Sequence, residues 1–262
     1  MKQFFRPIAF IIGVTAILVC VAASAAPAPQ PKEKDKAAEK DPAETLVDSG
    51  SFGVFMSGHR VGTETFSITQ DRTGSIIKSE FKTENDPKGE QAVQSSELHL
   101  TPTGDIRRYD WKELSPERAS SVVVPNDQFL NQKWSTGAQG KDQEQPYILP
   151  PSTSILDDYF FVHREVLAWK FLATSCKQEN GQVQCPLKQR AQFGTLDPRQ
   201  HSSAPLTAEY LGREKISYKG NQREFNKIEL KTESGAWQLW LDDQFKVVHI
   251  SIEGDNTEVS RD

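Results

Sequence analysis

The most regular feature of the chain is an alternation of apolar and polar positions that begins near Ser49. Phe52, Val54 and Met56 alternate with small or polar residues. Successive side chains of a β-strand point to opposite faces, so this period of two predicts strands with one buried face. The same period, interrupted by turn residues, recurs at 61–68, 76–83, 91–101, 106–114, 207–218, 223–232, 236–241 and 247–253. Short strands with turns about every 8–12 residues are typical of an antiparallel meander.

The pattern changes in the middle of the chain, where residues 153–172 are predicted to form one helix. Apolar residues recur there at spacings of three and four, which makes a wide stripe on one helix face. The stripe comprises Ile155, Tyr159, Val162, Val166 and Trp169, with Leu156, Phe160, His163 and Leu167 as a neighbouring row. Ser154 and Asp157 have the Ser-x-x-acid spacing of a capping box. Asp157 and Asp158 would then lie in the first turn, where the helix dipole favours anions.

These elements predict a mainly β protein of antiparallel twisted sheets that form open half-barrels around one central amphipathic helix. The folded domain is expected over residues 48–255, with one sheet in 48–149, the helix in 153–172, a second sheet in 173–255, and a tail at 256–262. A two-fold internal repeat is a further hypothesis. Gly62-Thr63-Glu64 resembles Gly212-Arg213-Glu214, and the hairpin at 98–109 resembles the one at 239–250. A chance likeness of hairpins remains the alternative.

Two cysteines follow the helix and are expected to form a disulfide. Cys176 and Cys185 flank a segment that contains Asn180-Gly181, a strong signal for a tight hairpin turn. Pairing across that hairpin would close a short loop in an oxidising compartment. The alternative is a redox-active pair, which the spacing disfavours because it is not Cys-x-x-Cys and no helix N-terminus follows.

The N-terminus predicts export from the cytoplasm. Residues 1–25 combine a positive start, an apolar run over 8–21 and the small residues Ala23-Ser24-Ala25, so we expect a signal peptide cleaved after Ala25. The alternative is an uncleaved membrane anchor, but the run is shorter than the ~18–20 apolar residues that a span requires. Val19 stands before Cys20 where a lipoprotein signal carries a small residue, which disfavours a lipid anchor. We expect a periplasmic or extracellular protein with no transmembrane span after cleavage.

Residues 26–47 are expected to be a disordered tether. This segment is rich in Ala, Pro, Lys and Glu, and its large apolar residues come only at the very end. It cannot bury enough surface to offset the entropy of ordering. A tail that binds a cell-wall component or a partner is the alternative.

Charge narrows the classes of function. The 262 residues carry a net charge of −5, and removal of residues 1–25, which hold two positive charges and no negative ones, brings it to −7. An acidic chain without a basic stripe argues against a nucleic-acid binder and a polybasic membrane-surface protein. Three cysteines are too few for a disulfide scaffold.

Three segments carry a resemblance to a known group. GHRVGTETFSI at 58–68, ILDDYFFVHREVL at 155–167 and WQLWLDDQFKVVHISIE at 237–253 resemble exported bacterial domains of unknown function. The likeness covers about residues 49–255 and implies open antiparallel half-barrels, similar in architecture to periplasmic lipoprotein carriers. Two features of the last segment depart from such domains: Gln238-Leu239 stands between the two tryptophans, and Phe245 stands where a Gly is expected. The resemblance implies no catalytic residues.

The search for chemistry yields no catalytic, cofactor or metal motif. There is no Gly-x-Ser-x-Gly, His-Glu-x-x-His, Walker or Gly-x-Gly-x-x-Gly sequence, and the histidines are widely scattered. His163 on the apolar stripe is either a core histidine or, paired with Asp158 or Tyr159, an acid/base site. As weak candidates for a ligand-binding face we name Tyr159, His163 and Trp169. The aromatic residues around them fit a core better than a ligand cage.

We therefore expect a noncatalytic binding or carrier-like module for a hydrophobic ligand or envelope component, without cofactor or metal. The expected ligand is a lipid, an acylated protein or a hydrophobic peptide. The alternative is a structural domain that interacts with another envelope protein, and an unrecognised enzyme is less favoured. An open, apolar concave face would select the carrier, whereas a filled one would select the structural domain.

Overall fold

The computed structural model describes residues 44–84, 91–116, 118–137, 140–179, 182–252, 254 and 256–262. These residues belong to one compact unit, Asp41–Asp262. The expected signal peptide with its cleavage point at Ala25, Cys20, most of the expected tether and the Asn180-Gly181 turn lie outside the described residues.

The first half of the unit is a meander of antiparallel strands, as the alternation predicts. In chain order they are β1 (Thr45–Met56), β2 (His59–Asp71), β3 (Gly74–Thr83), β4 (Val93–Leu100), β5 (Ile106–Ser115), β6 (Ser120–Asn126), β7 (Phe129–Ser135) and β8 (Gln143–Tyr147). Because β1 begins at Thr45, the tether expected over 26–47 ends earlier than predicted. Burial alternates residue by residue along β4, where Leu98 is buried and Glu97 and His99 are not. One face of the sheet is therefore buried and the other is wet.

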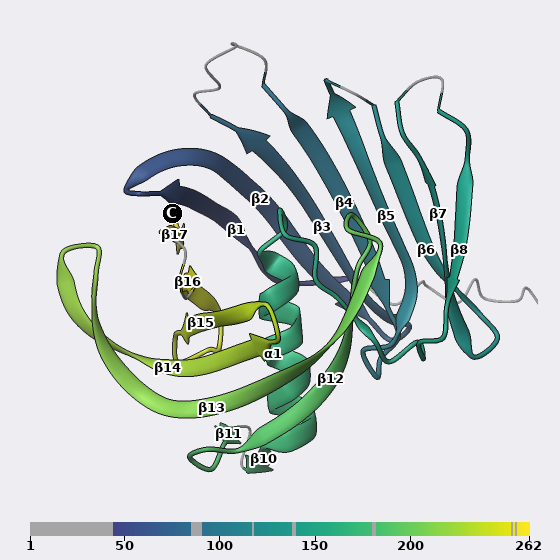
Figure 1. The fold of residues 1–262 in the computed structure, drawn as a ribbon. Coiled ribbons are helices and arrows are strands. Elements are labelled where there is room, and N and C mark those ends of the chain that lie inside the picture. Colours follow the sequence, from purple (N-terminus) through teal and green to yellow (C-terminus); the bar gives the residue numbers. More distant parts are fainter. Residues whose placement is uncertain are drawn as a thin grey trace, which may run out of the picture. The chain divides into compact units, whose positions relative to one another are not determined.

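The second half holds the helix and the remaining strands. After the short β9 (Ser154–Ile155) come α1 (Val162–Ser175), β10 (Lys177–Glu179), β11 (Gln182–Gln184), β12 (Arg190–Asp197), β13 (Ser202–Tyr218), β14 (Asn221–Thr232), β15 (Gly235–Leu241), β16 (Val247–Ile252) and β17 (Thr257–Arg261). Figure 1 shows β12, β13 and β14 curving around α1. The expectation of a mainly β fold with one helix is confirmed.

Fifteen strands of the described residues form one sheet, in the order β8-β7-β6-β5-β4-β3-β2-β1-β17-β16-β15-β14-β13-β12-β9. The sheet is open, with β8 and β9 at its edges, and β10 and β11 form a separate hairpin. All neighbours are antiparallel except β9 and β12, which pair in parallel. The two sheets expected in 48–149 and 173–255 are thus continuous.

The pairing of the first strand, β1, with the last strand, β17, joins the two halves into one sheet. β17 pairs with β1 on one side, where Val54 lies opposite Val259, and with β16 on the other. The prediction that 256–262 is a tail is therefore wrong. The strand is short and polar except for Val259, and its partner β1 is the first strand of the sheet in chain order. No local pattern reports such a pairing.

The helix begins later than its sequence pattern predicts. Residues 153–172 were expected to be helical from a cap at Ser154, whereas α1 spans Val162–Ser175 and Ser154 belongs to strand β9. Asp157 is fully buried ahead of the helix, where its carboxylate meets Arg199. A tertiary ion pair thus takes the carboxylate that the local rule assigns to a helix cap.

The core lies between α1 and the inner face of the sheet. Buried apolar residues of both halves join those of the helix in one cluster, which includes Phe52, Ile77, Leu98, Phe171 and Ile250. Phe160 and Phe171 are fully buried against the sheet. The inner face is therefore filled along most of α1, and any ligand site must lie beside the helix.

The hypothesis of an internal repeat fits the order of strands. One sequence likeness pairs β2 with β13, and the other pairs the β4–β5 hairpin with β15–β16, so both keep the same spacing of strands in the sheet. The chemistry of the matched positions differs, since Glu64 is fully buried and Glu214 is half-exposed. The repeat therefore remains a hypothesis about architecture.

Candidate functional site

The N-terminus of α1 is held by a carboxylate from strand β2. The backbone N–H of Phe161 donates to Glu64 Oε2 at 2.7 Å and that of Val162 donates to Glu64 Oε1 at 3.3 Å, while the Ser79 hydroxyl donates to Oε1 at 2.7 Å. Two helix N–H groups that would otherwise lack a partner are thereby satisfied, and the helix dipole favours the negative charge. Burial nevertheless raises the pKa of Glu64 to about 7. This contact fixes the start of α1 against β2 and β3.

A second charged network ties the first turn of α1 to the seam between β1 and β17. Arg261 donates to Asp48 Oδ2 at 2.7 Å and to Glu165 Oε2 at 2.8 Å, and the N–H of Val247 donates to the same Glu165 oxygen. Burial opposes the charge of Asp48, but hydrogen bonds from Arg261 and Lys246 outweigh it and bring the pKa of Asp48 to about 2. These residues hold the helix in place and line none of the hollows described below.

A third network lies ahead of the helix and accounts for the carboxylates of Asp157 and Asp158. Asp157 accepts from the Tyr109 hydroxyl at 3.0 Å and from Arg199 at 3.1 Å. Asp158 is half-exposed and accepts from Arg164. The two aspartates therefore serve separate ion pairs, and neither bonds His163.

The pocket of interest lies beside α1, between the helix and the buried ends of β3, β4 and β9. It has a volume of about 230 Å³, and the helix lines it from His163 to Thr174. Leu98, Ile155 and Leu167, all buried, form its apolar wall. Ala173 and Thr174 are exposed. The pocket therefore opens towards the C-terminal end of α1 and deepens towards His163.

His163 is the polar group at the deep end. Its side chain is 1% exposed, its ring lies edge-on to Tyr109, and neither ring nitrogen has a hydrogen-bond partner among the described residues. Burial lowers the pKa of His163 to about 3, so the neutral imidazole offers one donor and one acceptor. The Thr153 hydroxyl, also on the pocket wall and 1% exposed, has no partner there either. Buried polar groups are nearly always paired with protein or ordered water, so these three atoms can take a partner from outside the described residues.

Lys170 stands nearer the mouth, two helical turns from His163. Its ammonium donates to the backbone oxygens of Ser152 at 2.6 Å and Gly104 at 3.0 Å. Gly104 has a φ of +78°, a left-handed conformation that glycine adopts without strain, and this turn presents its carbonyl to the lysine. Burial lowers the pKa of Lys170. No carboxylate pairs with it among the ion pairs of the described residues.

The predicted ligand-face residues are brought together only in part. His163 and Trp169 line the pocket, and the Trp169 indole N–H donates to the Phe245 carbonyl at 2.6 Å, which fixes its ring. Tyr159 lies outside the pocket, where its ring contacts Arg199 and Phe81. Sequence reasoning missed Thr153 and Lys170. Lys170 follows His163 by seven residues, a spacing that places both on one helix face, so this signal was present.

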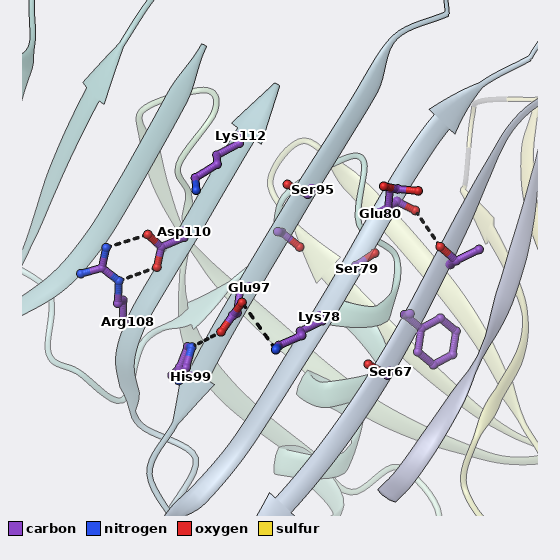
Figure 2. A pocket seen from close by; sticks show the side chains of 13 residues that line it. Ser67, Lys78, Ser79, Glu80, Ser95, Glu97, His99, Arg108, Asp110 and Lys112 are labelled. Carbon is purple, nitrogen blue, oxygen red and sulfur yellow. Dashed lines mark hydrogen bonds and ion pairs between the residues drawn. The ribbon is translucent and has the colours of Figure 1, made fainter. Parts of the chain in front are cut away.

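A larger hollow of about 760 Å³ lies on the wet face of β2–β5. Figure 2 shows its serines between charged side chains that already pair with one another. Glu97 accepts from His99 at 2.6 Å and lies 3.9 Å from Lys78, and Arg108 pairs with Asp110. Exposed, self-paired charges are what a solvated sheet face requires. The Ser96 hydroxyl, which is buried at its floor, has no hydrogen-bond partner among the described residues, but the paired charged side chains around it offer no free group for a ligand.

Cys176 and Cys185 lie at disulfide distance, with their sulfurs 2.02 Å apart, as the sequence predicts. Cys176 is the C-cap of α1, and Cys185 follows β11, so the bond ties the small hairpin to the end of the helix. A helix C-terminus disfavours a thiolate, which argues against a redox-active pair.

The rest of the described chain offers no other obvious chemistry. It contains no group of three or more His, Cys, Asp or Glu side chains that could hold a metal ion. Within the same residues, no helix is long and apolar enough to cross a membrane.

Comparisons with known proteins add little. No family model matches the chain, and no curated protein matches it. A crystal structure of a DUF1089 family protein from Pseudomonas aeruginosa is a weak structural neighbour, with a TM-score of 0.41, 10% sequence identity, and coverage of 75% of this chain and 91% of that chain.

Proposed function

We propose that this chain is a noncatalytic binding module that holds one small hydrophobic ligand in the pocket beside α1. The observation that carries the proposal is His163, a buried imidazole without a partner at the end of a pocket with apolar walls. Ligand sites typically combine apolar walls with a few placed polar groups. The volume of about 230 Å³ exceeds the ~150 Å³ cavity that holds a benzene, yet is below the ~300 Å³ of drug-sized sites.

The size of the pocket narrows the expected ligand. Because the inner face is filled, it leaves no room for a whole acylated protein. A ligand with one short alkyl chain is the better occupant of the pocket. The N-terminal sequence supports a periplasmic or extracellular location for this binding, and the resemblance to periplasmic half-barrel proteins fits it. Edman sequencing of the protein recovered from its host tests the export half of the proposal, which expects Ala26 as the first residue.

Calorimetric titration with 1-octanol tests the binding half. This probe pairs an alkyl chain with one hydroxyl that can both donate and accept. We expect saturable 1:1 binding with a negative heat-capacity change. Ala173→Trp, at the exposed mouth, should weaken binding at least tenfold. Ile148→Trp is the matched control because Ile148 is exposed and does not line the pocket. An absence of saturable binding to the unsubstituted protein would refute the proposal.

A structural domain that contacts another envelope protein is the second candidate. Two observations favour it: the inner face is filled along most of α1, and large apolar side chains are exposed near the β8 edge. Ile148, just after β8, is 88% exposed and Phe129 of β7 is 43% exposed. Crosslinking in cells followed by pull-down should recover a discrete partner that Ile148→Asp releases. Recovery of the monomer alone removes this candidate.

A further inference from the structure

The face of α1 above the pocket has a polar group at each end and apolar residues between them. His163 lies at the deep end and Lys170 near the mouth, with Val166 and Leu167 between them. At ~1.5 Å of rise per residue, the seven residues from His163 to Lys170 span about 10 Å along the helix axis. The pocket-lining face of the helix therefore carries two different polar groups, at positions about 10 Å apart along its axis.

Each end has hydrogen-bonding capacity to spare. An ammonium has three donors, and Lys170 directs two contacts to the carbonyls of Gly104 and Ser152. The charge of Asp105 acts on Lys170 from beyond ion-pair distance, and no carboxylate of the described residues forms the ion pair with this lysine that partly buried charges normally have. His163 can donate once and accept once at the other end. The mouth thus favours an anion, and the deep end favours a group that both donates and accepts.

We propose that the ligand is an unbranched aliphatic carboxylate with a hydroxyl group near the far end of its chain. This inference rests on the proposed function and names the ligand class of the same pocket. The carboxylate accepts from Lys170 at the mouth, the chain lies along Val166 and Leu167, and the hydroxyl bonds His163. About eight carbons match the ~10 Å between the two helix positions.

The test compares three ligands by titration calorimetry: octanoate, 8-hydroxyoctanoate and 1-octanol. The unsubstituted protein should bind 8-hydroxyoctanoate about tenfold more tightly than octanoate, since one hydrogen bond to an otherwise unpaired group is gained. This comparison needs no variant, so it stands even if a substitution prevents folding. Equal affinities would overturn the role assigned to His163.

Two variants then test the His163 end and the Lys170 end of the pocket separately. His163→Leu should abolish the preference for the hydroxylated acid, so that octanoate and 8-hydroxyoctanoate bind with equal affinity. Lys170→Gln should weaken octanoate binding about tenfold more than it weakens 1-octanol binding, whereas Lys112→Gln, which removes the same charge from the wet face of the sheet, should change neither. If Lys170→Gln weakens octanoate and 1-octanol equally, the anion site is wrong.

The outcomes distinguish this inference from the function beneath it. Binding of 1-octanol without preference for either acid overturns the ligand class and keeps the binding module. Failure of all three ligands to bind the unsubstituted protein overturns both.

Discussion

At the scale of single residues, the side chains that organise this protein are buried charged or polar groups. Their partners lie far away in the sequence. Glu64 caps a helix that begins 98 residues later, and Asp157 pairs with Arg199 instead of capping. The sequence contains Gly62-Thr63-Glu64 as a candidate repeat, but nothing local reports that its carboxylate reaches α1. The Ser154 capping box has correct spacing and is wrong because a capping rule considers only neighbours in sequence.

Glu64→Gln should change how stability depends on pH. Burial raises the pKa of Glu64 from 4.5 to about 7, so the folded chain binds the proton more tightly than the unfolded chain. The free energy of unfolding should therefore fall as pH rises from 4.5 to 7, by about 3 kcal/mol from this group. Urea unfolding across this range should show that the free energy of unfolding depends less on pH in Glu64→Gln than in the unsubstituted protein. Glu214→Gln, at the matched half-exposed position, should barely alter the pH dependence over this range, because a hydrogen bond from Lys227 lowers the pKa of Glu214 and moves its titration to lower pH. A pH dependence in Glu64→Gln equal to that of the unsubstituted protein would contradict the assignment.

His163→Leu should stabilise the protein while it impairs the preference for a hydroxylated ligand. Replacement of an unpaired buried polar group by an apolar one of similar size is neutral or favourable, so we expect a gain of about 1–2 kcal/mol at pH 7. Burial lowers the pKa of His163 from 6.5 to about 3, so the unfolded chain binds the proton first. The gain should grow as pH falls below 6.5. Leu167→Met on the same helix should shift stability by the same amount at every pH; a loss of stability in His163→Leu would show that its nitrogens have partners.

At the scale of elements, the strands within hairpins follow the alternation of the sequence, whereas the seam between β1 and β17 does not. A period of two reports which face of a strand is buried, but not which strand lies next to it. β17 was missed because it is only Thr257–Arg261 long and its neighbours include the first strand. Charged side chains at this seam, rather than apolar area alone, connect it to the helix.

Arg261→Met should destabilise the protein by about 3 kcal/mol, because it leaves Glu165 buried without its cation and Asp48 with Lys246 alone. Denaturant unfolding measures the loss. Arg213→Met is the control: Arg213 pairs with Glu224 and Asp243 at the surface, where ion pairs contribute less than about 1 kcal/mol. Similar losses of stability in the two variants would mean that the seam network contributes no more to stability than a surface ion pair.

Reduction of the Cys176–Cys185 bond should lower the free energy of unfolding by about 2–3 kcal/mol, the value expected from closing a loop of about ten residues. Thermal unfolding with and without a reductant measures this difference. The double variant Cys176→Ala/Cys185→Ala should be insensitive to the reductant, and a reductant effect in that variant would point to another target.

At the scale of the whole molecule, the predicted class holds: a mainly β protein with an open antiparallel sheet and one helix. The choice between a filled and an open inner face could not be made from sequence, because it depends on how side chains from both halves of the chain meet around α1. The structure gives a mixed answer. Phe160 and Phe171 fill most of the interface, and the space beside His163 and Lys170 remains as a pocket.

The central claim is that a ligand enters this pocket and bonds the imidazole at its deep end. Nitrogen-15 NMR of the histidine side chains during titration with 1-octanol tests it directly. We predict that the ring nitrogens of His163 shift and saturate at one equivalent, while those of the exposed His59 and of His99 on the outer face stay in place. Unchanged His163 resonances at saturating 1-octanol, or equal shifts in all the histidines, would contradict the claim.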